Sequence, residues 1–195
     1  MAALNHAFVN QDARTAAERG MRVEGIDQLA AGALLYRFVQ RADVRDDTCS
    51  ASPWWFQQSA VRRILEAARM GHRGEDSVAG QAARMAALSA TWPRSGANYL
   101  LAAKARAPLA FFWGAPRPVG KRSATQTEAT GLASGDDIHS LEHIPDPRCT
   151  QFFIPGLWDP ALSGQAIRVV SRTKFSHSAD LADGDIDTFL RQTGG

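Results

Sequence analysis

The chain has 195 residues, of which 45% are apolar and 22% are charged, and its formal net charge is +2. This composition excludes a disordered chain, which would combine few apolar residues with a high net charge, and it excludes collagen-like and coiled-coil proteins. We expect one globular domain over residues 1–195. The small net charge also argues against binding of nucleic acid through bulk electrostatics.

The N-terminal segment has no apolar core behind a basic end, which a Sec signal peptide requires. No run approaches the ~20 apolar residues of a membrane span. We therefore expect a protein that is cytoplasmic in the cell that makes it, has no membrane contact, and reaches another cell, if it does, without a Sec signal. Cys49 and Cys149 form no metal-ligand motif. They are interpreted as two thiols in a reducing compartment, with a single disulfide left open.

The first half of the chain predicts helices around one strand. Residues 1–30 are Ala-rich and predict weak helix. The apolar run ALLYRFVQ at 33–40 predicts a strand. Ser52 followed by Pro53 predicts a helix start, a hydroxyl cap and then proline at the first helical position. Apolar residues at helical spacing continue from there to a stop at Gly71.

The middle of the chain predicts a helix, then strand, then loop. A second helix is expected from about 78 to 91, because Pro93 would end it. The aromatic and aliphatic run at 98–114 predicts one strand bent at Pro108, or two strands. Residues 115–150 are rich in Pro, Gly, Ser, Thr and Asp. A run of that length without periodicity predicts a lid-like or mobile loop.

The last third predicts two strands. QFFIPGL at 151–157 indicates a strand that ends in a Pro-Gly turn, and AIRVVSRTKF at 166–175 indicates another. A short helix carrying Ile186, Phe189 and Leu190 is expected to close the chain. Because helices and strands are segregated, the pattern favours an α+β fold, with N-terminal helices packed on a split antiparallel β core.

Common catalytic motifs are missing from the sequence. It has no P-loop, no dinucleotide-binding GxGxxG, no HExxH and no GxSxG. His139 and His143 are four residues apart with Glu142 between them, but they sit in the polar loop, so we expect no metal site. A hydrolase or nuclease that uses one of these histidines stays open as a third interpretation.

Three short segments nevertheless indicate a binding site for a ligand that carries an anion and a flat ring. Arg37 lies inside an apolar strand, where a guanidinium is costly unless it meets water or an anion. Ser50 and Ser52 precede the aromatic residues Trp54 and Trp55. A helix start with hydroxyls suits a phosphate, and the indole rings suit stacking.

The third piece is Gln151, which opens a strand after the long loop, where its amide can both donate and accept a hydrogen bond. With these pieces in this order, residues 33–175 resemble mono-ADP-ribosyltransferase toxins of the Arg–Ser–Glu type and the related NAD-glycohydrolase toxins. The family carries an Arg in a first core strand, a Ser-Thr-Ser element before a helix, and a Glu that starts a late strand. LLYRFV, SAS and TQFFIPG are similar to these elements.

The resemblance implies NAD as the substrate and assigns roles to these residues. Arg37 would hold the phosphate or ribose of NAD, and Ser50 or Ser52 would order the site. Trp54 or Trp55 would stack on nicotinamide. Gln151 would stand where the family has its catalytic Glu, as in NAD-glycohydrolase toxins.

Two acids on the loop, Glu128 and Glu142, are alternatives for the catalytic role. With Gln at the key position no strong general base is available, which favours NAD hydrolysis or transfer to an acceptor that needs little deprotonation. The acceptor would be a protein or nucleic acid, and an immunity or antitoxin partner is expected. The competing hypothesis is a non-enzymatic Arg-rich interaction or nucleic-acid-binding protein. It rests on the helix that carries Arg62, Arg63 and Arg69.

Overall fold

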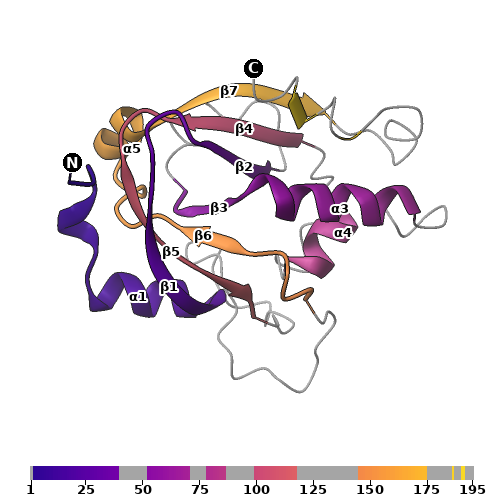
Figure 1. Ribbon diagram of the computed structural model, residues 1–195, viewed down its shortest axis with the longest axis horizontal. Helices are drawn as coiled ribbons and strands as arrows, with labels where there is room; N and C mark the ends of the chain where they lie inside the picture. The colour runs from indigo at the N-terminus through magenta and orange to yellow at the C-terminus, as the bar shows by residue number, and fades with distance from the viewer. Residues whose placement is uncertain are drawn as a thin grey trace, which may run out of the picture.

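The computed structural model describes residues 2–39, 52–70, 78–86, 99–117, 145–174, 186 and 190–191. Within them, seven antiparallel strands form one sheet in the order β1-β5-β6-β3-β2-β4-β7 (Figure 1). The strands are β1 (Met21–Leu29), β2 (Leu34–Val39), β3 (Trp54–Phe56), β4 (Tyr99–Ala105), β5 (Leu109–Pro116), β6 (Gln151–Phe153) and β7 (Ile167–Lys174).

The helical elements are η1 (His6–Phe8), α1 (Gln11–Glu18), α3 (Gln58–Met70), α4 (Val78–Met85) and α5 (Pro160–Ala166). The predicted α+β class is confirmed, since every strand pairing in the sheet is antiparallel and the helices pack beside the sheet rather than linking parallel strands. Figure 1 places α3 and α4 together beside β2 and β3, with α1 beside β1 at the other end of the sheet.

Three of the predicted strands, β2, β6 and β7, and the body of the main helix are found where the sequence indicated. β2 matches the predicted strand at 33–40, and β6 ends in the predicted turn, where Gly156 adopts a left-handed φ of 85°. Residues that carry a side chain rarely adopt that φ, and a Cβ at position 156 would also lie 2.7 Å from the ring atom Cγ of Phe8. The helix α3 buries its apolar stripe, Ala60, Val61, Ile64, Leu65 and Ala68.

The predicted helix start at Ser52 is wrong. Residues Trp54–Phe56 form the strand β3, and α3 begins only at Gln58. β3 pairs with β2 on one side and with β6 on the other. Long-range pairing of three aromatic residues therefore prevails over the local Ser-Pro signal, because it satisfies their backbone groups and buries their rings.

Two further elements differ from the prediction. The weakly helical N-terminal region includes the strand β1, which pairs along its length with β5. The short helix α5 was not expected, although Asp159 caps it by accepting a hydrogen bond from Ala161 N at 2.9 Å, with Pro160 at the first helical position. The run at 98–114 forms two strands, β4 and β5, which lie in different parts of the sheet.

The apolar core lies on both faces of the sheet. One cluster joins β2, β3 and β4 to α3 and α4, and includes Tyr36, Phe56 and Ile64; Ile186 and Leu190 of the predicted closing helix also pack in it. The other cluster joins β2, β3, β5 and β6 to the α5 region, and includes Trp55 and Phe152. The central strands are therefore buried on both sides, which explains why they are almost wholly apolar.

Candidate functional site

The residues that the sequence singled out lie on three strands that are neighbours in the sheet. Arg37 is on β2, Trp54 and Trp55 are on β3, and Gln151 opens β6. β6 is distant from β2 and β3 in the chain, so the fold brings the three short pieces side by side (Figure 1). Ser50 lies outside the described residues.

The pleat separates Gln151 from Arg37. Tyr36, Phe56 and Gln151 are paired across β2, β3 and β6, so their side chains share one face. Gln151 is 5% exposed, and its side-chain Nε2 donates a hydrogen bond to the carbonyl oxygen of Ala86, just after α4. Arg37 is the next residue along β2, so it faces the opposite side of the sheet.

On its own face, Arg37 lies in a row with other side chains. Arg37 pairs with Leu101 of β4, and Leu101 pairs with Arg172 of β7. Two arginines therefore lie on the same face, one on either side of a buried leucine. Arg37 is half-buried, whereas Arg172 is exposed.

The same row continues in the other direction as aromatic rings. The antiparallel ladder that joins Tyr36 to Phe56 brings Arg37 beside Trp55 at its next position. Trp55 pairs with Phe152, which pairs with Trp113 of β5. Trp55 and Phe152 are buried, but Trp113 is partly exposed. We call the set Arg172, Leu101, Arg37, Trp55, Phe152 and Trp113 the arginine–aromatic row.

Trp113 and Arg172 were missed by the sequence analysis. No local motif marks either residue, because the row is created by strand register rather than by spacing in the chain. Trp113 lies close over β1, where a Cβ on Gly25 would come 2.8 Å from its ring nitrogen Nε1. Glycine at position 25 therefore leaves the space that the indole fills.

Ser52 organises the start of β3 rather than a helix. Its hydroxyl accepts a hydrogen bond from the backbone N–H of Trp54 at 3.3 Å. Its carbonyl accepts one from the indole Nε1 of Trp55 at 2.7 Å. The buried indole is thus satisfied internally.

Trp54 is on the face opposite Trp55. Its ring packs edge-on against Phe153, with 4.9 Å between ring centroids. Phe153 in turn lies 6.2 Å from the half-exposed ring of Trp158. Trp54 and Trp55 therefore belong to different faces of the sheet, so the two indoles do not form one stacking surface.

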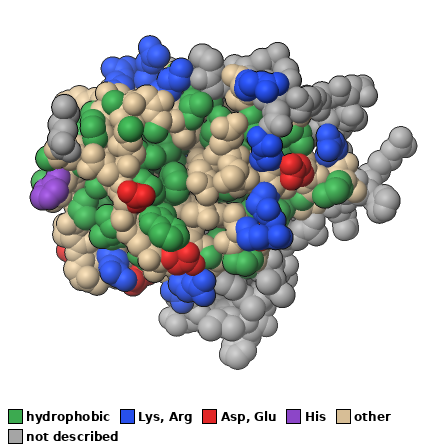
Figure 2. Space-filling view, in the orientation of Figure 1, with side chains coloured by type: hydrophobic (Ala, Val, Ile, Leu, Met, Phe, Trp, Pro, Cys, Tyr) green, Lys and Arg blue, Asp and Glu red, His purple; other side chains and the backbone are tan. Residues whose placement is uncertain are grey.

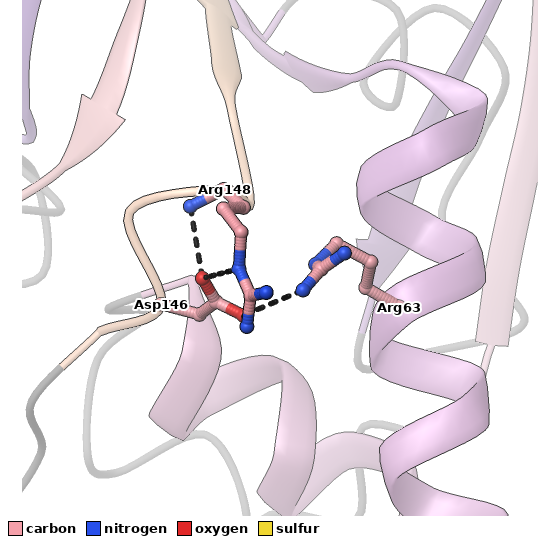
Figure 3. Close-up of polar contacts among 3 residues, drawn as sticks. All are labelled: Arg63, Asp146 and Arg148. Atoms are coloured by element: carbon pink, nitrogen blue, oxygen red, sulfur yellow. Dashed lines mark hydrogen bonds and ion pairs between the residues drawn. The ribbon is translucent and has the colours of Figure 1, made fainter.

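A charged cluster fixes the segment that leads into β6. Asp146 accepts hydrogen bonds from the backbone N–H and Nε of Arg148, at 2.9 and 3.0 Å, and from Nη2 of Arg63 on α3 at 3.4 Å (Figure 3). The backbone N–H of Asp146 donates to Met85 of α4. This cluster therefore ties the approach to β6 onto both α3 and α4.

The Arg148 guanidinium, hydrogen-bonded to the carboxylate, lowers the pKa of Asp146 below its ordinary value, and burial opposes this shift. Next to the cluster, Cys149 is a buried free thiol. Burial raises the pKa of Cys149 to about 12. A thiol that stays protonated at neutral pH is a poor nucleophile, so Cys149 acts as a core residue.

Four further candidates, Glu128, Glu142, His139 and His143, lie outside the described residues. Among the residues that the structure does describe, no three His, Cys, Asp or Glu side chains gather in a way that could hold a metal ion. No described helix is both long enough and apolar enough to cross a membrane.

Basic side chains are divided among several places. Figure 2 shows separate groups of Lys and Arg on this face, with carboxylates between some of them, rather than one continuous basic stripe. On α3, Arg63 is engaged with Asp146. The helix thus uses one of its arginines to hold the fold together.

Comparison with known proteins gives little that can be transferred. The sequence matches no protein-family model, and no curated protein matches it. Among solved structures, the chain is similar to Rhs1-CT in complex with its cognate immunity protein RhsI1. The TM-score is 0.34 and the identity 11%, over 77% of this chain and 80% of that chain. At that TM-score the likeness assigns no site, so the function has to be argued from this chain's own residues.

Proposed function

We propose that this protein is an NAD-cleaving effector and that NAD lies along the arginine–aromatic row. The supporting observation is the row itself, which sets two guanidinium groups at one end and an indole ring at the other. NAD pairs a diphosphate anion with two flat rings. Planar guanidinium forks suit the diphosphate, and a partly exposed indole suits a ring.

The length of the arginine–aromatic row also matches that of an extended dinucleotide. Arg37 and Trp113 are separated by three strand spacings, or about 14–15 Å at the usual distance between neighbouring strands. A dinucleotide in extended form needs a site of this scale. Between the two ends Trp55 and Phe152 are buried in the core, so the contacts with NAD would come from the groups at the ends of the row.

In the proposed reaction, the bond between ribose C1′ and the nicotinamide nitrogen breaks and nicotinamide leaves with the electron pair. Positive charge develops on the ribose, and water or a macromolecular acceptor adds to C1′ and releases a proton. Arg37 would hold the diphosphate so that the ribose is fixed while this charge develops.

The group that stabilises the ribose is the open part of the proposal. Gln151 is bonded to Ala86 on the other face of the sheet, so we assign this task to one of the two acids named from the sequence, Glu128 or Glu142, which lie outside the described residues. Hydrolysis or transfer, the acceptor, and an immunity or antitoxin partner stay predictions from the resemblance.

The test is nicotinamide release from NAD by the purified protein, followed by chromatography. We expect Arg37→Ala to lower the rate by roughly 10²–10³-fold, the scale for loss of one electrostatic contact in a transition state. Arg22→Gln, an exposed arginine on the far edge strand β1, is the matched control and should keep the wild-type rate. Glu128→Gln and Glu142→Gln tested singly identify the acid.

The proposal fails if the wild type neither releases nicotinamide nor binds NAD saturably, or if Arg37→Ala cleaves NAD at the wild-type rate. An intact NAD pool together with salt-dependent binding of oligonucleotides would instead support the Arg-rich interaction protein.

A further inference from the structure

A second feature of the molecule lies apart from the row. Gly32, Lys104, Ala105, Arg106 and Arg168 line a hollow of about 410 Å³. We call it the basic hollow. Figure 2 shows Lys and Arg side chains gathered along the upper edge of the molecule, where Figure 1 draws β4 and β7.

Two of the cations that line the basic hollow lie close enough to repel each other. Lys104 and Arg168 are direct cross-strand partners on β4 and β7. Like charges in that relation destabilise a sheet. Within the described part of the chain, no ion pair or side-chain hydrogen bond engages Lys104, Arg106 or Arg168. An arrangement that costs stability and has no internal partner is typical of a binding site.

The backbone around the basic hollow is fixed. The N–H of Gly32 donates to the carbonyl of Ala105 at 2.7 Å, and the N–H of Ala105 donates back to Ala33 at 2.9 Å. The N–H of Arg106 donates to the carbonyl of Ala166, at the end of α5, at 2.8 Å. The cations are thus carried by hydrogen-bonded backbone, so a ligand has to order their side chains but not the chain that carries them.

The lining indicates the chemistry of the ligand. Among the residues that the structure describes, it holds three cations and two small residues, and neither a carboxylate nor an aromatic ring. The described lining therefore offers no aromatic face on which a base could stack. Arginine forks and a lysine suit phosphate oxygens, and one phosphate group carries about −1.5 to −2 charges near neutral pH.

We propose that the basic hollow binds a small anion with two or more phosphate groups, such as a diphosphate moiety. The site is separate from the arginine–aromatic row, because Lys104 is on the opposite face of β4 from Leu101. It therefore does not depend on NAD cleavage and can be tested without it.

The test is calorimetric titration of the full chain with inorganic pyrophosphate, with sulfate as a comparison anion. We expect saturable binding of pyrophosphate that weakens as salt increases, and weaker binding of sulfate. Lys104→Gln and Arg168→Gln should each raise the Kd by roughly tenfold or more. Arg22→Gln, on the opposite edge strand, should leave the Kd unchanged.

A second measurement uses the repulsion between the two strands. Without ligand at low salt, Arg168→Gln should raise the melting temperature by roughly 1–3 °C, because it removes one of two opposed like charges. With saturating pyrophosphate the order should reverse, since only the wild type gains the full stabilisation by ligand.

Three results would overturn the assignment to a small polyphosphate anion. The first is no pyrophosphate binding at millimolar concentration. The second is a Kd that Lys104→Gln and Arg168→Gln leave unchanged. The third is tighter binding of single-stranded oligonucleotides with affinity that grows with their length, which would identify the hollow as part of an extended nucleic-acid surface.

Discussion

The two faces of the central strands differ in how far they bury their polar side chains. On the face covered by α3 and α4, Gln151 is buried and its amide is bonded to the backbone at Ala86. On the other face, Arg37 is only half-buried, in a row whose far end carries a partly exposed Trp113. Both faces are therefore buried at their centres, but the helix-covered face also buries its polar group, whereas the second face keeps Arg37 and Trp113 partly exposed at the two ends of a buried apolar stretch.

The largest expected effect on stability distinguishes the buried middle of the arginine–aromatic row from its partly exposed end. Trp55→Ala should lower the free energy of unfolding by about 3–5 kcal/mol, because it removes a wholly buried ring. Trp113→Ala should cost clearly less, since its ring is partly exposed. Urea denaturation of both variants measures the two costs. Equal costs would mean that Trp113 is core and cannot receive a ligand.

The next test concerns Gln151, where the resemblance would place a catalytic Glu. Gln151→Glu removes the amide that donates to Ala86 and sets a carboxylate against a carbonyl oxygen in a buried place. We expect the variant to lose about 1–3 kcal/mol of stability and to gain no NAD-cleaving activity. Urea denaturation and nicotinamide release measure the two readouts. Full stability with faster cleavage would move the catalytic site to the helix-covered face.

The smallest expected effect concerns Asp146, which fixes the segment before β6 to α3 and α4. Asp146→Asn should lower the free energy of unfolding at pH 7 by about 1 kcal/mol or less, because solvent screens the pair with Arg148. The folded-state pKa of Asp146 lies below its ordinary value of 3.8. Its stabilising contribution is therefore present above that value and is lost as the pH falls through the lowered pKa.

The measurement is thermal unfolding of wild type and Asp146→Asn from pH 7 down to pH 2. The gap between the two melting temperatures should close in the acidic part of this range. A gap that stays constant at every pH would show that the carboxylate charge contributes nothing and that the asparagine acts through packing alone.

The sequence by itself determined the elements whose signals are local. Helical spacing placed α3, the run ALLYRFVQ placed β2, and the Pro-Gly pair placed the turn after β6. Segregation of helices and strands also predicted the α+β class. Each of these patterns works within a few residues, through periodic burial or a restricted φ.

The tertiary structure alone decided which chemistry-bearing residues meet. It converted Trp54–Phe56 from a predicted helix start to a strand, because the aromatic run pairs with β2 and β6. It also placed Arg37 with Trp113 and Arg172, and turned Gln151 to the opposite face. Strand register is fixed by long-range pairing, and a shift of one residue exchanges the two faces of a sheet, so no local motif can reveal which side chains share a site.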